Sequence, residues 1–494
     1  MQDLILADLN LVTLLPVCAL IVGALLILCI DIFNNDISKR FYTIISVLFI
    51  LLSLGFLIGL EPNQKGFFDV MLVDGIGVLS QIIILVASIL FIALALNSQE
   101  FNEHRFAEFF ALFLFMIAGF VFMVSSENLI LIFLGLETGS LALYTIIAMH
   151  SRQKAIEAAI KYFCMGALAA GFFAFGAMIL YALTGSVDIS VIHERLIEKN
   201  FEPMYAVLGG IAFILGTLAF KLSLIPFHTW APDVYEGSSA PLAGYMSVVP
   251  KIATFVVVLR FFEVLISSGL TWLHDMLYLL VIVTITLANL MALAQTDVKR
   301  MLGFSSISHA GFVLAAVLIA SIGEDVVSYQ AKTAIFFYWV FFMFTNLGAF
   351  SMLWIARNKE NLWDERFQHP FVKFSGMVKV APFAAVIMAL FMLSLAGIPP
   401  FSVFWGKIYI MSLAINAEYV GLAIIMAINN AIAAYYYLKL IIYMFLKEPI
   451  EKDGSIYIIN SSGPLVFIVG IAAIFTIFAF VLIEPLLRLI QYYL

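Results

Sequence analysis

Charged side chains are scarce in this chain of 494 residues, because Asp, Glu, Lys and Arg together make up only 12% of it. The net charge of -7 leaves no excess of basic residues, which argues against nucleic-acid binding. The three cysteines, Cys18, Cys29 and Cys164, lack the C-x-x-C spacing of an iron–sulfur or zinc site, and no glycine-rich nucleotide-binding motif is present. We therefore expect the chain itself to bind neither a metal nor a redox cofactor.

Apolar residues, by contrast, account for 64% of the chain, and they recur in runs long enough to cross a bilayer as helices. These runs predict an all-α integral membrane protein with about 14 transmembrane helices. The acidic start lacks the basic region of a cleaved signal peptide, so we expect the first run to be retained. The predicted spans are 11–31, 41–60, 74–96, 106–126, 128–149, 160–183, 204–228, 240–264, 272–294, 299–321, 330–356, 380–412, 418–446 and 464–489.

Two of the predicted spans contain residues that interrupt a helix. Pro226 interrupts the seventh, and the twelfth contains Gly397, Pro399, Pro400 and Gly406. Interrupted segments in corresponding positions of two halves are typical of inverted-repeat transporters. We therefore predict two inverted repeats with broken seventh and twelfth helices. The predicted division of the chain is 1–105 for helices 1–3, 106–265 for the first repeat, 266–447 for the second repeat and 448–494 for the last helix.

Lysine and arginine concentrate in the loops that follow odd-numbered spans, which predicts that these loops are cytoplasmic. Both chain termini are then expected on the periplasmic side. Length and composition suit the inner membrane of a bacterium. The cations that carry this prediction are Lys39, Arg40, Arg105, Arg152, Lys154, Lys299, Arg300, Arg357, Lys359, Arg366, Lys373, Lys379, Lys447 and Lys452.

Several ionisable side chains are predicted to lie inside the membrane, where a charge costs at least about 2.5–3.5 kcal/mol and usually marks a functional site. We interpret the four that fall deepest, in separate spans, as a series of proton carriers: Glu137, Lys221, Lys251 and Lys407. For those nearer to span ends we expect static ion pairs or positions at the membrane interface: Lys161, Lys332, Lys439 and Arg260.

Imidazole both donates and accepts protons near neutral pH, so two histidines are further candidates. His309 lies inside the tenth predicted span beside serine hydroxyls, and proton transfer and packing are equally open for it. For His228, at a helix end beside Asp233, we favour a structural role. The tyrosines of the run 435–437 are expected to face lipid or to pack in the core.

Two motifs resemble those of a known family. Residues 220–237, FKLSLIPFHTWAPDVYEG, are similar to the seventh-span signature of the antiporter-like subunits of respiratory complex I, and residues 393–407, LSLAGIPPFSVFWGK, to their twelfth-span signature. The similarity extends over essentially the whole chain. The N-type subunits match best, because the chain has DVYEG at 233–237, has Lys407 where M-type subunits have glutamate, and lacks the lateral helix of L-type subunits.

The resemblance implies a proton-translocating subunit of the membrane arm, in which Glu137 pairs with Lys221, Lys251 is the bridging lysine and Lys407 is the terminal group. It also places further ionisable residues of the family at Glu108, Lys161 and His309. It implies NADH, FMN, iron–sulfur clusters and quinone in other subunits, and M-, K- and J-type subunits together with membrane lipid as neighbours. The sequence leaves open whether the electron donor of the whole complex is NADH or, as in related complexes, a reduced carrier protein.

Two alternatives stay open from the sequence. One is a subunit of a sodium/proton antiporter, because antiporters of the Mrp type carry relatives of these motifs, although the DVYEG stretch argues against it. The other is a membrane scaffold whose buried charges form static ion pairs. Four ionisable residues in separate spans argue against the scaffold.

Overall fold

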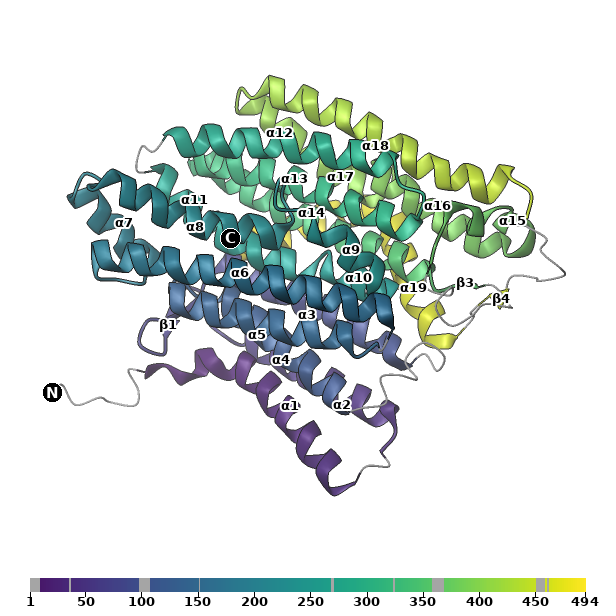
Figure 1. Cartoon of the computed structure of the whole chain (residues 1–494), viewed down its shortest axis with the longest axis horizontal. Coiled ribbons are helices and arrows are strands. Elements are labelled where there is room, and N and C mark those ends of the chain that lie inside the picture. The colour runs from purple at the N-terminus through teal and green to yellow at the C-terminus, as the bar shows by residue number, and fades with distance from the viewer. Residues whose placement is uncertain are drawn as a thin grey trace.

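The computed structural model of the chain describes residues 9–34, 37–96, 107–150, 152–267, 271–322, 325–357, 368–449, 458–459 and 462–494. Within these residues the chain is a bundle of helices that run side by side along its longest axis (Figure 1). The long helices are α1 (Leu15–Phe33), α2 (Lys39–Ile58), α3 (Gly75–Ala93), α4 (Ala107–Val124), α5 (Leu129–Ala148), α6 (Gln153–Thr184), α8 (Met204–Leu222), α11 (Val249–Ser267), α12 (Thr271–Leu293), α13 (Val298–Ile322), α14 (Asp325–Met352) and α18 (Val420–Leu446).

The predicted all-α membrane architecture is confirmed, since twelve stretches of the described residues are long and apolar enough to cross a membrane. The predicted fourteenth span folds into two helices, α19 (Gly463–Ile477) and α20 (Ala479–Tyr493), which are bent by 85° relative to each other. The exact number of spans therefore stays a prediction.

The seventh predicted span is interrupted, but earlier in the chain than its proline. α8 ends at Leu222, because Pro226 has no N–H to donate to the Leu222 carbonyl four residues before it. Ser223 follows in the left-handed conformation with φ of 59°. The chain then turns into the short helix α9 (Trp230–Gly237).

The twelfth predicted span is interrupted in the same way, by two prolines. α16 (Pro382–Ala396) ends because Pro399 and Pro400 cannot donate to the carbonyls of Leu395 and Ala396. Gly397 closes the helix in the left-handed conformation with φ of 76°, and the span continues as α17 (Ser402–Asn416). The prediction of broken seventh and twelfth helices is confirmed.

The short strands lie at the ends of the bundle. A hairpin of β1 (Gln64–Gly66) and β2 (Met71–Val73) lies at one end, and the antiparallel pair β3 (Ala356–Arg357) and β4 (Ile458–Ile459) at the other (Figure 1). The remaining short helices are α7 (Ile189–Glu198), α10 (Ala240–Met246), α15 (Met377–Val380) and the 3-10 turns Leu11–Leu14, Leu94–Leu96 and Phe371–Phe374.

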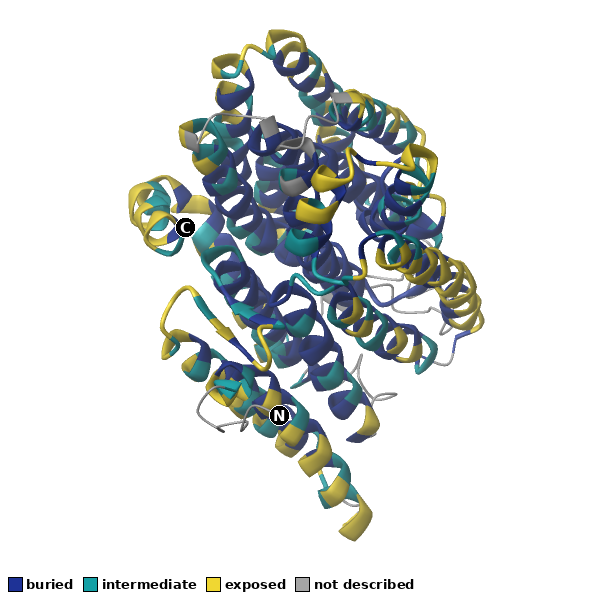
Figure 2. Cartoon of the chain, turned by 90° about the vertical axis from the view of Figure 1, so that its left-hand side faces the viewer, coloured by how far each residue is buried: buried dark blue, intermediate teal, exposed yellow. Residues whose placement is uncertain are grey.

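Burial separates central from peripheral helices. Every residue is buried in the most apolar windows of 240–263 and 298–321, which contain α10, α11 and α13. In α2 and α6 only 33% of the corresponding window is buried. Figure 2 shows the exposed residues gathered on the outer faces of the bundle. Lys251, on α11, is therefore shielded from lipid by the protein around it.

Some sequence predictions fall outside the described residues. These include the boundary after residue 105 and four of the loop cations, Arg105, Lys359, Arg366 and Lys452. The division into repeats and the orientation of the termini stay predictions.

Candidate functional site

Lys221, in the last turn of α8, is buried and held by hydroxyl groups of α5. Its Nζ donates to Ser140 Oγ at 2.7 Å and to Tyr144 Oη at 3.3 Å. Glu137 lies three and seven residues before these two hydroxyls, on the same face of α5. Its carboxylate interacts electrostatically with Lys221, and its buried Oε1 makes no hydrogen bond in the described structure. Lys221 is therefore hydrogen-bonded to neutral groups, with the carboxylate nearby.

Lys251, near the start of α11, is 1% exposed and points to α13. Its Nζ donates to the Ser306 carbonyl at 2.8 Å and approaches the Ser306 hydroxyl at 3.2 Å. That hydroxyl donates in turn to the carbonyl of Gly303 at 2.9 Å. Both oxygens that bind this ammonium group are uncharged.

Lys407, in α17, is buried beside the break of its own span. Its Nζ donates to the Leu395 carbonyl at 2.8 Å and to Asn430 Oδ1, on α18, at 2.6 Å. The Leu395 carbonyl is available because Pro399 cannot bond to it within a helix. It also belongs to the C-terminal end of α16, where the helix dipole favours a cation. The interruption of the helix thus supplies one acceptor of the lysine.

His309 connects three further side chains and interacts electrostatically with both Lys251 and Lys407. Its Nδ1 is 2.5 Å from Tyr338 Oη, and its Nε2 is 3.1 Å from Tyr437 Oη. The Tyr437 hydroxyl also bonds to Ser305, the neighbour of the serine that binds Lys251. Both ring nitrogens are therefore part of a buried hydrogen-bond network.

The structure does not bring Glu108 and Lys161 into this buried series. Glu108 is exposed at the start of α4, where it lines a mainly apolar groove of about 590 Å³. Lys161 is 44% exposed on α6 and forms ion pairs with Glu157 at 2.7 Å and Asp233 at 3.2 Å.

Of the other cations near span ends, Lys332 and Arg260 form ion pairs with carboxylates, whereas Lys439 has a backbone carbonyl as its partner. Lys332 pairs with Glu263 at 2.5 Å, and Arg260 pairs with Asp74 at 2.7 Å. Lys439 donates to the carbonyl of Gln295 at 3.3 Å. Carboxylates thus pair with Lys161, Lys332 and Arg260. Neutral oxygens, by contrast, bind Lys221, Lys251 and Lys407. We call these last three residues the relay lysines.

The helix α9 carries an ion-pair cluster after the break of the seventh span. Arg300 Nη1 lies 2.7 Å from Asp233 and 2.8 Å from Glu236. Burial alone would raise the pKa of the Asp233 carboxyl, but the hydrogen bonds from Arg300 and Lys161 outweigh it and lower the pKa below its usual value. The pKa of Glu236 is lowered in the same way, against the effect of burial, by Arg300 and Lys154. Both carboxylates are therefore ionised at neutral pH and act as anchors.

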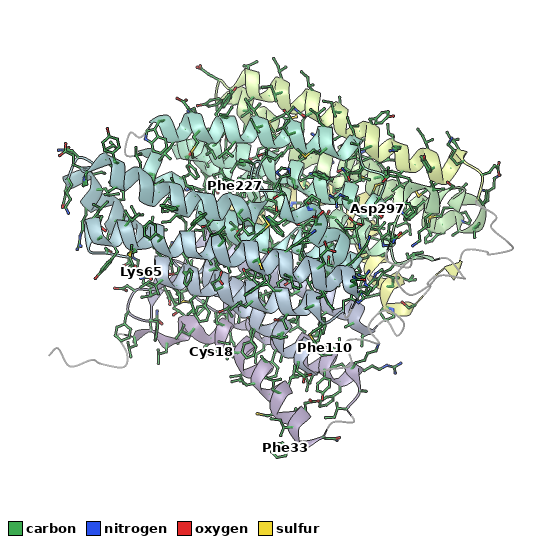
Figure 3. The ribbon with its side chains drawn as sticks, viewed as in Figure 1. Cys18, Phe33, Lys65, Phe110, Phe227 and Asp297 are labelled. Carbon is green, nitrogen blue, oxygen red and sulfur yellow. The ribbon has the colours of Figure 1, made fainter. Side chains whose placement is uncertain are left out.

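His228 lies in the break between α8 and α9, next to Phe227, which Figure 3 labels near the middle of the bundle. Its Nδ1 is 3.3 Å from the Pro226 carbonyl. The expected neighbour Asp233 is engaged instead by Arg300 and Lys161.

The sequence did not predict most hydrogen-bond partners of the relay lysines. The prediction that the tyrosines of 435–437 face lipid or pack in the core also left out the hydrogen bond of Tyr437 to His309. Tyr435 is 65% exposed, as expected of a residue that faces lipid, but Tyr437 is completely buried and bonds to His309. Consecutive residues of a helix point about 100° apart, so three in a row cannot share one face. The spacing of Ser140 and Tyr144 after Glu137 was a usable signal, because it places all three on one face of α5.

No group of three or more His, Cys, Asp or Glu side chains within the described ranges is arranged to hold a metal ion. The cysteines Cys18, Cys29 and Cys164 are free and exposed.

Comparison with known proteins shows which family the chain belongs to. The family model described as "NADH:quinone oxidoreductase/Mrp antiporter, TM" matches residues 126–433. NADH-quinone oxidoreductase subunit N of Sulfurimonas denitrificans is 57% identical over 490 residues, which cover 98% of this chain and 96% of that protein. The subunit N of a Sulfurovum species is 55% identical over 487 residues, covering 98% of this chain and 97% of that protein.

The fold also matches a chain in the structure of respiratory complex I from Thermus thermophilus with bound aureothin. The two are 26% identical, with a TM-score of 0.75, and the match covers 96% of this chain and 98% of that one. The chain therefore belongs to the NADH:quinone oxidoreductase/Mrp antiporter family of membrane subunits, as a relative of subunit N of NADH-quinone oxidoreductase.

Proposed function

We propose that the chain is a membrane-arm subunit of an NADH-quinone oxidoreductase and couples electron transfer in other subunits to proton translocation through Glu137 and the relay lysines, with His309 between Lys251 and Lys407. One observation carries this proposal: each relay lysine is buried in the bundle and is hydrogen-bonded to uncharged oxygens. A lysine held by a carboxylate stays charged, whereas one held by neutral groups gains or loses its proton as nearby charges change.

Glu137 is the group that would make the first lysine switchable. Its unpartnered Oε1 is free to accept a hydrogen bond when Lys221 leaves the hydroxyls that hold it. Moving one charge against 100 mV requires about 2.3 kcal/mol, so net transport needs a driving reaction. Oxidation of NADH by quinone in other subunits supplies it, and the isolated chain is not expected to catalyse a reaction.

The surrounding assembly follows from the same proposal. NADH, FMN, iron–sulfur clusters and quinone belong to other subunits, and M-, K- and J-type subunits are neighbours in the inner membrane of a bacterium. Both termini are periplasmic. The repeats comprise 106–265 and 266–447, and each contains one interrupted helix with a relay lysine beside the break.

Lys161 and Glu108 have supporting roles in this proposal. Lys161 anchors α9 through Asp233. Glu108 faces outward and is available to a neighbouring subunit.

A sodium/proton antiporter subunit is the second candidate, because the family description includes Mrp antiporters. The relatives at 55% and 57% identity favour the oxidoreductase. Cation-driven proton exchange in vesicles without an electron donor would favour the antiporter instead.

The test is donor-driven proton uptake in membrane vesicles that carry Lys221→Ala in the assembled complex. We expect proton uptake and quinone reduction to fall together, whereas Lys332→Ala, which removes a lysine paired with a carboxylate, should leave both near the parental rate. Assembly is checked on the same membranes. If Lys221→Ala assembles and keeps both rates, the lysine is structural and the scaffold interpretation replaces this one.

A further inference from the structure

Four buried hydroxyl groups meet at the break of the twelfth span. Thr345, on α14, lies at their centre, with its Oγ1 2.7 Å from Ser402 Oγ and 3.3 Å from Ser394 Oγ. Its Oγ1 also lies 3.2 Å from Thr476 Oγ1, on α19. All four side chains are fully buried. These residues, which we call the Thr345 cluster, therefore connect α14, α16, α17 and α19.

Two members of the Thr345 cluster bridge the break itself. Ser394 lies in the last turn of α16 and Ser402 is the first residue of α17, and their Oγ atoms are 3.0 Å apart. The N–H of Val403 donates to Ser394 Oγ at 3.3 Å. The first N–H groups of a helix have no acceptor within that helix, so Ser394 satisfies one of them for α17. The end of α16 is thus bonded to the start of α17 through side chains.

The position of Lys407 depends on the same junction. Lys407 lies on α17, whereas its acceptor, the carbonyl of Leu395, belongs to α16 and is next to Ser394 in the chain. The 2.8 Å distance between Lys407 Nζ and this carbonyl therefore depends on how the two half-helices meet. Pro399 and Pro400 have no N–H to donate, so regular helical hydrogen bonds cannot fix that junction.

We propose that Thr345 is a positioning residue for Lys407, because its hydroxyl contacts both half-helices at the break and fixes the geometry in which Lys407 meets the Leu395 carbonyl. This inference rests on the proposed function and adds a residue that acts through Lys407 without carrying a proton itself. A threonine hydroxyl donates one hydrogen bond and accepts two, so the single oxygen of Thr345 can serve its three neighbours in the cluster.

The test is Thr345→Val in the assembled complex, which removes the hydroxyl and keeps the branched shape of the side chain. Assembly should be retained, because Ser394 and Ser402 still bond to each other and Thr476 still donates to the Ala472 carbonyl at 2.7 Å. We expect donor-driven proton uptake to fall by at least about tenfold, since a displacement of about 1 Å from a reacting geometry can cost up to about a hundredfold.

Thr345→Ser separates positioning from packing. Serine restores the hydroxyl but lacks the methyl group of threonine, so it should recover most of the proton uptake that Thr345→Val loses. Ser402→Ala removes the other hydroxyl of the 2.7 Å contact and should lower proton uptake as well. The double variant should be no slower than the more severe single variant, because both changes break the same contact. Ser402→Ala also decides the question if Thr345→Val does not assemble.

Thr333→Val is the matched control, because Thr333 is also a buried threonine of α14 but donates to the carbonyl of Tyr329 in its own helix at 2.9 Å. It should keep the parental rate. A loss of proton uptake by Thr345→Ser or by Thr333→Val equal to that of Thr345→Val would refute the positioning role.

Lys407→Met is measured in parallel. If Lys407→Met abolishes proton uptake while Thr345→Val and Ser402→Ala keep the parental rate, the positioning role is refuted and the proposed function stands. If Lys407→Met also keeps the parental rate, both are refuted.

Discussion

Gly397→Ala adds one methyl group in the break of the twelfth span and should impair proton transfer by Lys407, although the lysine itself is unchanged. Gly397 has φ of 76°, and a Cβ there would lie 3.0 Å from Lys407 Cδ and 3.2 Å from both amide atoms of Asn430. Gly397→Ala therefore carries the backbone strain of the left-handed conformation, about 1–2 kcal/mol. It also separates Lys407 from Asn430, and a hydrogen bond to a charged group contributes about 1.5–3 kcal/mol.

The weakened hydrogen bond between Lys407 and Asn430 is the contribution that affects function. At 1.36 kcal/mol for each factor of ten, the productive geometry of Lys407 becomes about tenfold to a hundredfold less populated. Donor-driven proton uptake by the assembled complex should fall by a similar factor. Gly185→Ala is the matched control, because Gly185 closes α6 with φ of 67° and an added Cβ approaches only Arg195, at 3.3 Å. Equal proton uptake by the two assembled variants would refute the assignment of Lys407 as a proton carrier positioned by Asn430.

Two further predictions concern the hydroxyl network and the anchor of α9. Tyr437→Phe removes a hydrogen-bond partner of His309 and should lower proton uptake by about tenfold or more. Tyr435→Phe, on the exposed face of the same helix, should leave proton uptake unchanged. Equal rates of the two variants in vesicle assays would contradict this prediction. Asp233→Asn should lower the thermal unfolding temperature at neutral pH. Because the pKa of the Asp233 carboxyl is lowered in the folded chain, its ionised form stabilises the fold. This stabilisation is complete above the ordinary pKa of about 3.9 and is lost as the pH falls through the lowered pKa. The unfolding temperatures of the parental protein and of Asp233→Asn should therefore converge in acid.

The sequence predicted those features that depend on local chemistry. Pro226 and Pro399 cannot donate within a helix, so the two interruptions were visible as residues, although α8 ends four positions before its proline. The depth of Glu137 and of the relay lysines followed equally from the apolar runs that contain them. For Lys251 and Lys407 the structure agrees, with exposed fractions of 1% and 3%.

The sequence could not supply contacts between distant segments. Lys407 and Asn430 lie on different helices, and their 2.6 Å hydrogen bond depends on how α17 packs on α18. Tyr437 is separated from His309 by 128 residues, so a run of tyrosines gave no reason to expect a hydrogen bond there. The hairpin of residues 64–73 was missed as well, because two strands of three residues leave only a weak alternating pattern.

The contrast between the partners of the relay lysines and those of Lys161, Lys332 and Arg260 has a physical reason. At an effective dielectric of about 20, a carboxylate about 4 Å from an ammonium group stabilises it by about 4 kcal/mol, and one about 7 Å away by about 2.4 kcal/mol. Direct pairing at Lys332 therefore fixes its charge. At Lys221, hydroxyl groups bind the ammonium group, and the carboxylate of Glu137 interacts with it without a direct ion pair. A shift of a few ångströms in the distance between the two charges changes their interaction energy by about 1.6 kcal/mol. That change alters the protonation equilibrium of the lysine more than tenfold. Small movements can drive proton transfer at such a site, and the same movements would leave the peripheral ion pairs protonated as before.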